Sequence, residues 1–171
     1  ACTPEKKQEA DYSQYVNPMI GTDFTGNTYP GAQVPFGMVQ LSPDNGLPGW
    51  DRISGYFYPD TTIAGFSHTH LSGTGAGDLY DISFMPVTRP YKEAPAPLGI
   101  YSTFSHNDEA ASAGYYRVLL KDYNINVELT ATERCGIQRY TFPEAEASVF
   151  LNLKKAMNWD FTLDSKIEVV D

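Results

Sequence analysis

Between Ile125 and Thr132 the chain alternates strictly between apolar and polar residues, which is the pattern that most constrains its fold. Ile125, Val127, Leu129 and Ala131 alternate with Asn126, Glu128, Thr130 and Thr132. A period of two places the two sets on opposite faces of a β-strand, one packed and one in contact with water. The segment is therefore predicted to be a strand with one buried face.

Other strand-like runs lie at short intervals on both sides of this one. We predict strands over residues 34–41, 53–58, 61–68, 82–87, 101–105, 115–120, 135–142, 147–153 and 166–170. Short strands at such spacing are typical of a mostly antiparallel β-sandwich, which is the predicted fold class. Near Gln138-Arg139 the apolar residues change from odd to even positions, and a β-bulge is predicted there. One short helix is predicted over residues 107–113, with Asn107 or Asp108 as its cap.

Composition excludes some classes of function. Of the 171 residues, 42% are hydrophobic, so the chain is not intrinsically disordered. The net charge of −9 opposes binding to a phosphate backbone, so nucleic acid is not an expected partner. Twelve Tyr, nine Phe and two Trp suit packed sheets, and a few of these rings are also suited to stacking on sugars.

The two ends of the chain suggest a longer, exported protein. Residues 1–14 are polar and are predicted to be a flexible tether, with an ordered domain over residues 15–171. Cys2 follows a small residue, as in a bacterial lipoprotein, and is a candidate for lipidation; a free thiol is the alternative. The strand predicted at 166–170 has no tail after it, which suggests a domain that continues.

Chemistry-bearing residues concentrate in the stretch 65–81, GFSHTHLSGTGAGDLYD. Small residues there would let backbone donors reach a ligand. His68 and His70 would share one face of a strand, where they could hydrogen-bond a ligand, pack in the interior or, with a third group such as His106, Asp78 or Asp81, hold a metal. The glycines at 73–77 lack the Lys of a phosphate loop and are read as a tight turn.

Carboxylates and an indole give a second hint. Asp44, Asp51, Asp78 and Asp81 are predicted to lie near loops, and glycosidases use two carboxyl groups roughly 5 to 9.5 Å apart. The sequence alone does not pair them, because each is also an ordinary turn residue. Trp50-Asp51 offers an aromatic face and a hydrogen-bond acceptor, as a sugar-binding pocket requires. The alternative is that the ring of Trp50 fills the end of the sandwich.

Several motifs together resemble one known family. They are VNPMIGT at 16–22, GNTYPGA at 26–32, PFGMVQLSPD at 35–44, GFSHTHLSGTG at 65–75 with GD at 77–78, AGYY at 113–116 and LTATER at 129–134. These motifs resemble the amino-terminal domain of glycoside hydrolase family 92, from about residue 15 to the end. Tyr80 departs from that pattern, because a small residue often follows GDL there.

The resemblance implies an inverting, calcium-dependent exo-α-mannosidase that acts on mannose-containing glycans, commonly with α-1,2 linkages. It implies a galactose-mutarotase-like β-sandwich followed by an (α/α)6 barrel, which would hold the catalytic acid and base and most of the calcium ligands. No catalytic or metal residue is therefore assigned to this chain. The sandwich is expected to contribute substrate-binding loops, with Trp50, Asp51, His68, His70, Thr74 and Asp44 as candidates and the turn at 27–29 beside them.

Two functions remain open at this point. The chain is either part of an α-mannosidase that is inactive without its barrel, or a stand-alone carbohydrate-binding sandwich without catalysis. The first reading implies a bacterial periplasmic or cell-surface enzyme, with a lipid anchor at Cys2. A purely structural sandwich is a third, weaker reading.

Overall fold

The computed structural model describes residues 10–77, 79–95, 97–153 and 162–170. Cys2, the lipidation candidate, and Asp78, one of the acidic candidates, lie outside these residues. No helix in the described part of the chain has the length and apolar character needed to cross a membrane.

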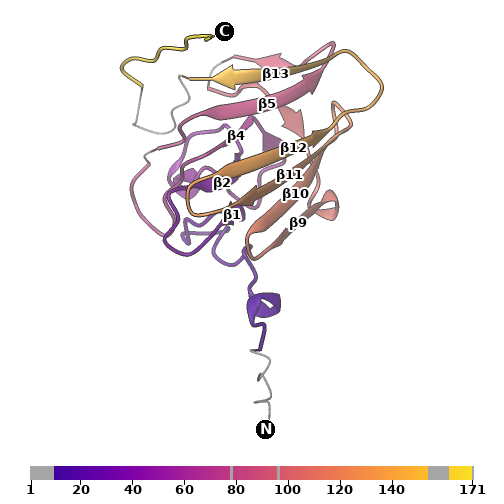
Figure 1. Ribbon diagram of the computed structural model, residues 1–171. Helices are drawn as coiled ribbons and strands as arrows, with labels where there is room; N and C mark the ends of the chain where they lie inside the picture. The colour runs from indigo at the N-terminus through magenta and orange to yellow at the C-terminus, as the bar shows by residue number, and fades with distance from the viewer. Residues whose placement is uncertain (1–9, 78, 96, 154–161, 171) are drawn as a thin grey trace, which may run out of the picture.

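Two antiparallel sheets, of five and four strands, form the body of the molecule, and in the view of Figure 1 the four-stranded sheet lies across the first two strands of the other. The five-stranded sheet has the order β1 (Ala32–Gln33), β2 (Gln40–Asp44), β4 (Gly65–Ser67), β5 (Ser83–Thr88) and β13 (Ala147–Asn152). The four-stranded sheet has the order β12 (Gly136–Thr141), β11 (Ile125–Ala131), β10 (Tyr115–Leu120) and β9 (Glu109–Ser112).

Shorter elements complete the fold. They are the strand pairs β3 (Thr62–Ile63) with β8 (Ser102–Thr103) and β6 (Glu93–Ala94) with β7 (Gly99–Ile100), and the 3-10 turns η1 (Ser13–Tyr15), η2 (Trp50–Arg52) and η3 (His106–Asp108). Every strand pair among the described residues is antiparallel. The predicted all-β, mostly antiparallel fold class is confirmed.

The core lies between the two sheets. Ile125, Val127 and Leu129 of β11 are buried, as the alternation predicts, and their neighbours in the chain are partly exposed. They belong to the same apolar cluster as Leu41 and Phe66 of the opposite sheet. Burying these side chains stabilises the fold by about 1.5–3 kcal/mol each, before the cost of ordering the chain.

The predicted strands near β5, β10, β11, β12 and β13 are confirmed within one or two residues. The strand predicted over 61–68 is present as β3 and β4, which are interrupted at Ala64, and only Ser102–Thr103 of the one predicted over 101–105 is a strand. The predicted bulge at Gln138-Arg139 is wrong: β12 pairs with β11 in unbroken register. The apolar residues of β12 do not all fall on one face, because Ile137, although apolar, is 60% exposed on the outer face.

Two predicted strands in the first half are wrong. Residues 34–39 form a turn, in which Phe36 has a φ of +62° and the amide of Gly37 donates to the carbonyl of Val34; the strand begins only at Gln40. Residues 53–58 are turns, with Gly55 at a φ of +89°. Ile53 and Tyr56 are nevertheless buried, so their apolar character reflects loop packing and not a strand.

The predicted helix over 107–113 and the final strand over 166–170 are also wrong. Ser105 caps the single turn η3, after which β9 begins at Glu109 and pairs with β10. Glu109 accepts hydrogen bonds from the hydroxyls of Tyr56 and Tyr116, so tertiary contacts override local helix propensity. Residues 166–170 are exposed and do not form a strand. A β-strand requires a neighbouring strand to pair with, and these residues pair with none among the described residues.

Candidate functional site

Three loops that carry the singled-out motifs meet at one end of the sandwich. The backbone amide of Gly73, in the stretch 65–81, donates to the carbonyl of Asn27 at 2.6 Å. The hydroxyl of Ser54, in the loop after η2, donates to the carbonyl of Thr28 at 2.8 Å. The turn at 27–29 therefore joins the other two loops, and the structure brings together segments that lie up to about 50 residues apart in the sequence.

A buried pair, Asp44 and His70, lies beneath these loops. Nε2 of His70 lies 2.9 Å from Oδ1 of Asp44, and its Nδ1 lies 2.7 Å from the carbonyl oxygen of Gln40. Both side chains are 0% exposed. In this structure they hold the stretch 65–81 against β2 and do not reach the surface.

Ser67 completes this cluster without forming a nucleophilic relay. Its hydroxyl lies 3.1 Å from Nε2 of His70, the same ring nitrogen that faces Asp44. In a Ser-His-Asp relay the serine and the carboxylate contact opposite nitrogens of the imidazole. The cluster is therefore a structural anchor, packed between the rings of Tyr29 and Tyr80 at centroid distances of 5.0 Å and 5.6 Å from His70.

Trp50 lies on the single turn η2 and is 58% exposed. A methyl group added at Gly75 would lie 3.2 Å from Cη2 of the indole, so the ring rests against bare backbone. Arg52 fixes the turn through a two-pronged ion pair with Asp60, with Nε to Oδ2 at 2.6 Å and Nη2 to Oδ1 at 2.5 Å. We name this exposed indole and its supporting turn the Trp50 platform.

Two other candidates lie close to the platform. Asp51, in the same turn, is half-buried. Thr74 is half-buried in the neighbouring stretch, and its hydroxyl accepts a hydrogen bond of 3.1 Å from the amide of Ala76. The structure thus brings the turn that carries Trp50 and Asp51 against the segment that carries Thr74, through the contact between Trp50 and Gly75.

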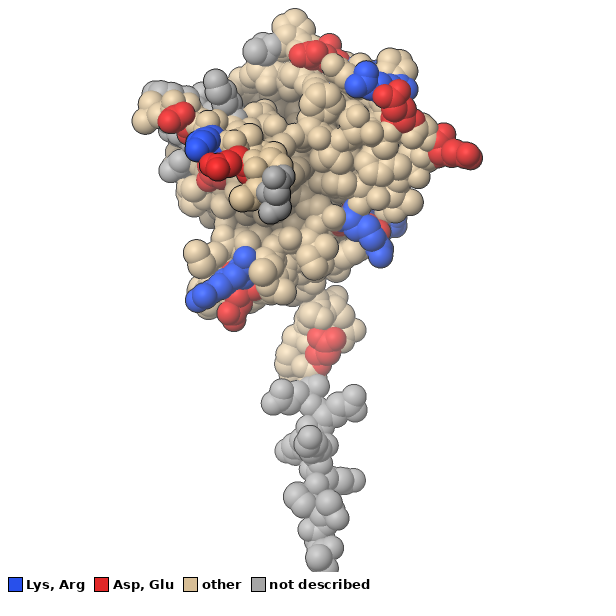
Figure 2. Space-filling view, turned by 45° about the horizontal axis from the view of Figure 1, so that its top comes forward, with Lys and Arg blue, Asp and Glu red and all other residues tan. Residues whose placement is uncertain are grey.

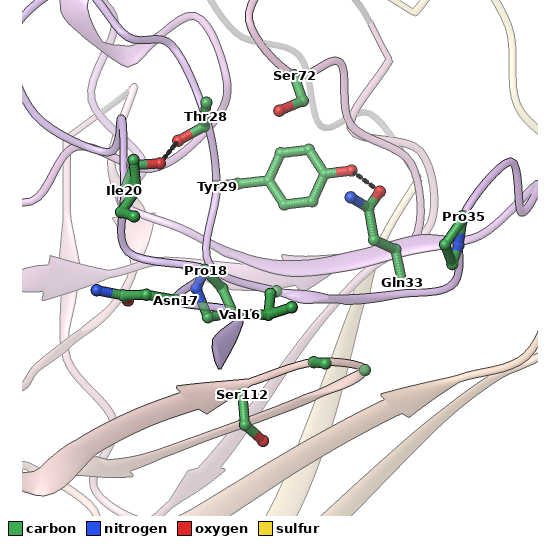
Figure 3. A pocket seen from close by; sticks show the side chains of 13 residues that line it. Val16, Asn17, Pro18, Ile20, Thr28, Tyr29, Gln33, Pro35, Ser72 and Ser112 are labelled. Carbon is green, nitrogen blue, oxygen red and sulfur yellow. Dashed lines mark hydrogen bonds between the residues drawn. The ribbon is translucent and has the colours of Figure 1, made fainter. Parts of the chain in front are cut away.

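A pocket of about 460 Å³ is lined in part by Thr28 and Tyr29 of the turn at 27–29 (Figure 3). Tyr29 extends across it and donates a hydrogen bond of 2.6 Å to Oε1 of Gln33, and Ser72 lies beside the ring. Burial raises the pKa of Tyr29, so its hydroxyl stays a proton donor at neutral pH. The lining consists of Val16, Asn17, Pro18, Ile20, Thr28, Tyr29, Gly31, Gln33, Pro35, Ser72, Ser112, Ala113 and Gly114.

None of these lining residues carries a charge, although the chain has a net charge of −9. The size is within the usual range of ligand pockets, roughly 300–1,000 Å³. Amide and hydroxyl groups at an uncharged wall favour a neutral, hydroxyl-rich ligand. Ser72 and Gly75 are three residues apart, so the pocket lies within about 10 Å of the platform along the backbone.

His68 does not join this site. Its Nδ1 lies 3.0 Å from the carbonyl oxygen of Ile82, and its ring packs edge-on against Phe84. The expectation that His68 and His70 face the same side is wrong, because β4 ends at Ser67 and strand alternation does not continue past it. His68 instead borders a second cavity of about 300 Å³, together with Phe84, Gly136, Gln138, Tyr140 and Val149.

The described residues offer no cluster for a metal ion: no three His, Cys, Asp or Glu side chains among them gather closely enough. The surface shown in Figure 2 also lacks an extended patch of one charge, because acidic and basic side chains lie beside one another around its margin. The candidate site therefore consists of aromatic, hydroxyl and backbone groups together with the single carboxylate of Asp51.

Sequence reasoning missed the residues that support the site. The resemblance places the turn at 27–29, which carries Tyr29, beside the site and marks Tyr80 only as a departure from the family pattern. It does not single out Gln33, and only burial and contacts give these three side chains their supporting roles. The Arg52–Asp60 pair is eight residues apart with no regular element between, so no spacing rule predicts it. A clue was available in GNTYPGA, which points to the turn that carries Tyr29.

Both the sequence and the fold resemble those of glycosidases. A family model, the glycosyl hydrolase family 92 N-terminal domain, matches residues 15–171. A family GH92 α-mannosidase from Bacteroides thetaiotaomicron, solved alone and in complex with mannoimidazole, is 44% identical with a TM-score of 0.80, over 85% of this chain and 20% of that one.

Two further relatives are more distant. A family GH92 inverting mannosidase from Bacteroides thetaiotaomicron is 30% identical with a TM-score of 0.68, over 85% of this chain and 20% of that one. An uncharacterized secreted glycosidase from Arthroderma benhamiae is 28% identical over 149 residues, which are 81% of this chain and 18% of that protein. The chain spans about a fifth of the length of these relatives.

Proposed function

We propose that this chain, which belongs to glycosyl hydrolase family 92 as its amino-terminal domain, forms one wall of the sugar pocket of an exo-acting α-mannosidase. The observation that carries the proposal is the Trp50 platform, an exposed indole held against Gly75 beside an uncharged pocket. The 44% identical relative is an α-mannosidase, which supports this substrate class.

The wall is suited to a neutral sugar. An indole face packs on the C–H groups of a pyranose ring, and hydroxyl and backbone groups bond its hydroxyls. We assign the stacking to Trp50 and the hydrogen bonds to Asp51 and Thr74, with Ser72 at the neighbouring pocket. Asp44 and His70 act from beneath, by holding the loops, and His68 would take part only if the sugar extends to the second cavity.

The chemistry of the reaction is proposed to lie outside this chain. An inverting glycosidase needs a general acid and a general base roughly 6.5–9.5 Å apart. We place this pair, and the ligands of a calcium ion, in an (α/α)6 barrel that follows the sandwich in the full-length protein. The described residues do not fit a calcium site of their own. The linkage we propose is α-1,2, in mannose-containing glycans such as N-glycans.

The location is proposed from Cys2 as a lipidation candidate and from one relative. A relative described as a secreted glycosidase supports an extracellular site of action. With a lipidated Cys2, the protein would be held at the periplasmic or outer surface of a bacterium. Mass spectrometry of the native protein tests the anchor, and an unmodified Cys2 would exclude it.

Substitution of Trp50 tests the function. In the full-length enzyme, Trp50→Ala should raise KM for an α-mannobioside by about tenfold, since a lost stacking ring contributes on the order of 1 kcal/mol or more. Trp50→Phe should retain most of the affinity. Tyr91→Ala is the control, because this exposed ring packs on Phe150 and not at the site. Metal content should stay the same in all three variants.

The alternative, a stand-alone carbohydrate-binding sandwich, predicts a different outcome. Calorimetric binding of mannan by the isolated 171 residues would favour that alternative. Absence of binding, with activity only when the downstream sequence is present, supports the enzyme. An unchanged KM in Trp50→Ala would refute the role of the platform in the enzyme.

A further inference from the structure

We infer that Tyr80 is a positioning residue for the Trp50 platform: it ties the end of η2 to the buried anchor and so sets where the indole stands. Only the predicted effect of Tyr80 on substrate binding rests on the proposed function. That Tyr80 restrains the turn is argued from the contacts of this chain alone.

The contacts of Tyr80 connect two of the three loops. Its side chain is 0% exposed, and its hydroxyl donates to the backbone carbonyl of Ile53. Ile53 directly follows η2, the turn that carries Trp50, and is itself 1% exposed. The ring of Tyr80 packs edge-on against His70. One side chain therefore joins the platform to the Asp44–His70 anchor.

The loop after η2 is shaped to receive this ring. Gly55 has a φ of +89°, and a methyl group added there would lie 3.1 Å from Cε1 of Tyr80 and 2.7 Å from Oδ1 of Asp44. A side chain at position 55 would push both groups away. The bare backbone lets Tyr80 come close enough to bond the carbonyl of Ile53.

The backbone that presents Tyr80 is strained. Leu79, Tyr80 and Ile82 have φ values of +81°, +69° and +54°, a region that is unfavourable for residues with a Cβ and most of all for a β-branched one. Hydrogen bonds hold this conformation: the amide of Tyr80 donates to the carbonyl of Thr69, and that of Asp81 to the hydroxyl of Thr69. Such strain persists only where surrounding contacts determine it, and here it directs the ring inward.

Two tethers thus fix the turn that carries Trp50. The Arg52–Asp60 ion pair holds the guanidinium of its last residue, and the hydroxyl of Tyr80 bonds the carbonyl of Ile53, the residue that follows it. If the hydroxyl of Tyr80 is removed, the carbonyl of Ile53 loses a buried donor, and the turn should open more often. The indole would then spend less time in the position that receives the sugar.

The test is Tyr80→Phe in the full-length enzyme, followed by amide hydrogen exchange and steady-state kinetics. Loss of one buried hydrogen bond should speed exchange of the amides of residues 50–55 by about tenfold. KM for an α-mannobioside should rise about threefold to tenfold with kcat unchanged, since a displaced platform weakens ground-state and transition-state binding alike.

Tyr123→Phe is the matched control. Tyr123 is also buried; its hydroxyl donates to the backbone carbonyl of Tyr101 at 2.7 Å and accepts from the backbone amide of Lys92 at 2.8 Å. This variant should lower the melting temperature at least as much as Tyr80→Phe does, with exchange at 50–55 and KM unchanged. Any effect of Tyr80→Phe that merely reflects lost stability would appear in both variants.

The outcomes separate this inference from the proposed function. Unchanged exchange at 50–55 in Tyr80→Phe overturns the positioning role. Faster exchange together with a raised KM supports it. If Trp50→Ala leaves KM unchanged, the sugar-binding role of the platform fails, while the exchange data still decide whether Tyr80 restrains the turn.

Discussion

Glu109 illustrates how one buried carboxylate determines the path of its neighbours. Its side chain is 1% exposed and accepts hydrogen bonds from the hydroxyls of Tyr56 and Tyr116, while Nδ1 of His106 lies 2.7 Å from Oε2. A buried carboxylate requires such partners, because an unsatisfied one would be costly. Burial, and then the charge of Glu109, raise the pKa of Tyr56, so this hydroxyl remains a donor.

Asp122 leads to a prediction about acid stability at the residue scale. Partial burial acts to raise its pKa, but hydrogen bonds from Lys92 and Thr103 outweigh that effect and hold the pKa below the ordinary value of 3.8. A depressed pKa in the folded state stabilises the protein above the unfolded-state pKa. That contribution should be lost as the pH falls from about 3.8 through the folded-state pKa.

The measurement is the melting temperature of wild type and Asp122→Asn between pH 7 and pH 2. Asp122→Asn should be less stable than wild type at pH 7, and the difference should shrink below about pH 3.8. A constant difference across this range would contradict the assignment. Glu144→Gln, at an exposed position in the turn before β13, is the control.

At the scale of elements, the pairing of β1 with β2 depends on a bare backbone at Gly31. A methyl group added there would lie 2.1 Å from the carbonyl oxygen of Leu41 and 2.4 Å from Cβ of Ser42. These atoms belong to β2, which is paired on both sides and cannot move aside easily. Gly31 also lines the candidate pocket, so its small size matters for the site as well as for the sheet.

Gly31→Ala should therefore destabilise the protein by more than about 3 kcal/mol, at the upper end of overpacking costs. Gly99→Ala is the matched control: Gly99 has a φ of +66° but nothing within 4 Å, so only backbone strain of about 1–2 kcal/mol is expected. Chemical unfolding of both variants measures the difference. Equal losses would show that β2 yields to the added methyl group.

For the whole molecule, the notable feature is the amount of apolar surface that this chain exposes. Phe24, Phe36, Met38 and Trp50 are exposed near the loops, and Ile137 and Val149 on the outer strands. β12 and β13 are the terminal strands of their sheets among the described residues, so their outer edges are available for pairing. Exposed apolar patches and strand edges both promote association.

The isolated 171-residue chain should accordingly self-associate at concentrations of roughly 0.1 mM and above, as measured by sedimentation velocity. Val149→Lys places a charge on the terminal strand β13 and should reduce association, because lysine protects sheet edges. Asn107→Lys, an exposed residue of η3, is the charge-matched control. A monodisperse monomer at high concentration would contradict this prediction.

Much of the fold could be predicted because it follows from local patterns. The strict alternation at Ile125–Ala131 places three side chains in the core whatever surrounds the strand, and β10 was located to the residue. The loops carry short motifs that are typical of the family. These features are encoded within a few residues of sequence.

Other features depend on partners that are remote in the sequence. Residues 107–113 have the local signals of a helix, but Glu109 pairs with Val118 and bonds Tyr56, so the segment becomes β9. Residues 166–170 have the pattern of a strand, and without a neighbour they form none. Secondary structure in a sheet is a property of pairs of segments, which a local pattern does not contain.

The candidate site also depends partly on local sequence and partly on contacts that are remote in the sequence. The sequence by itself determined the class of fold and the family, and it pointed to the loops of the candidate site, because burial patterns and motifs are local. Only the tertiary structure separated His70, buried against Asp44, from His68, which borders another cavity, and only it joined Tyr80 to Ile53. Which side chains anchor a site and which face the ligand is decided by long-range packing.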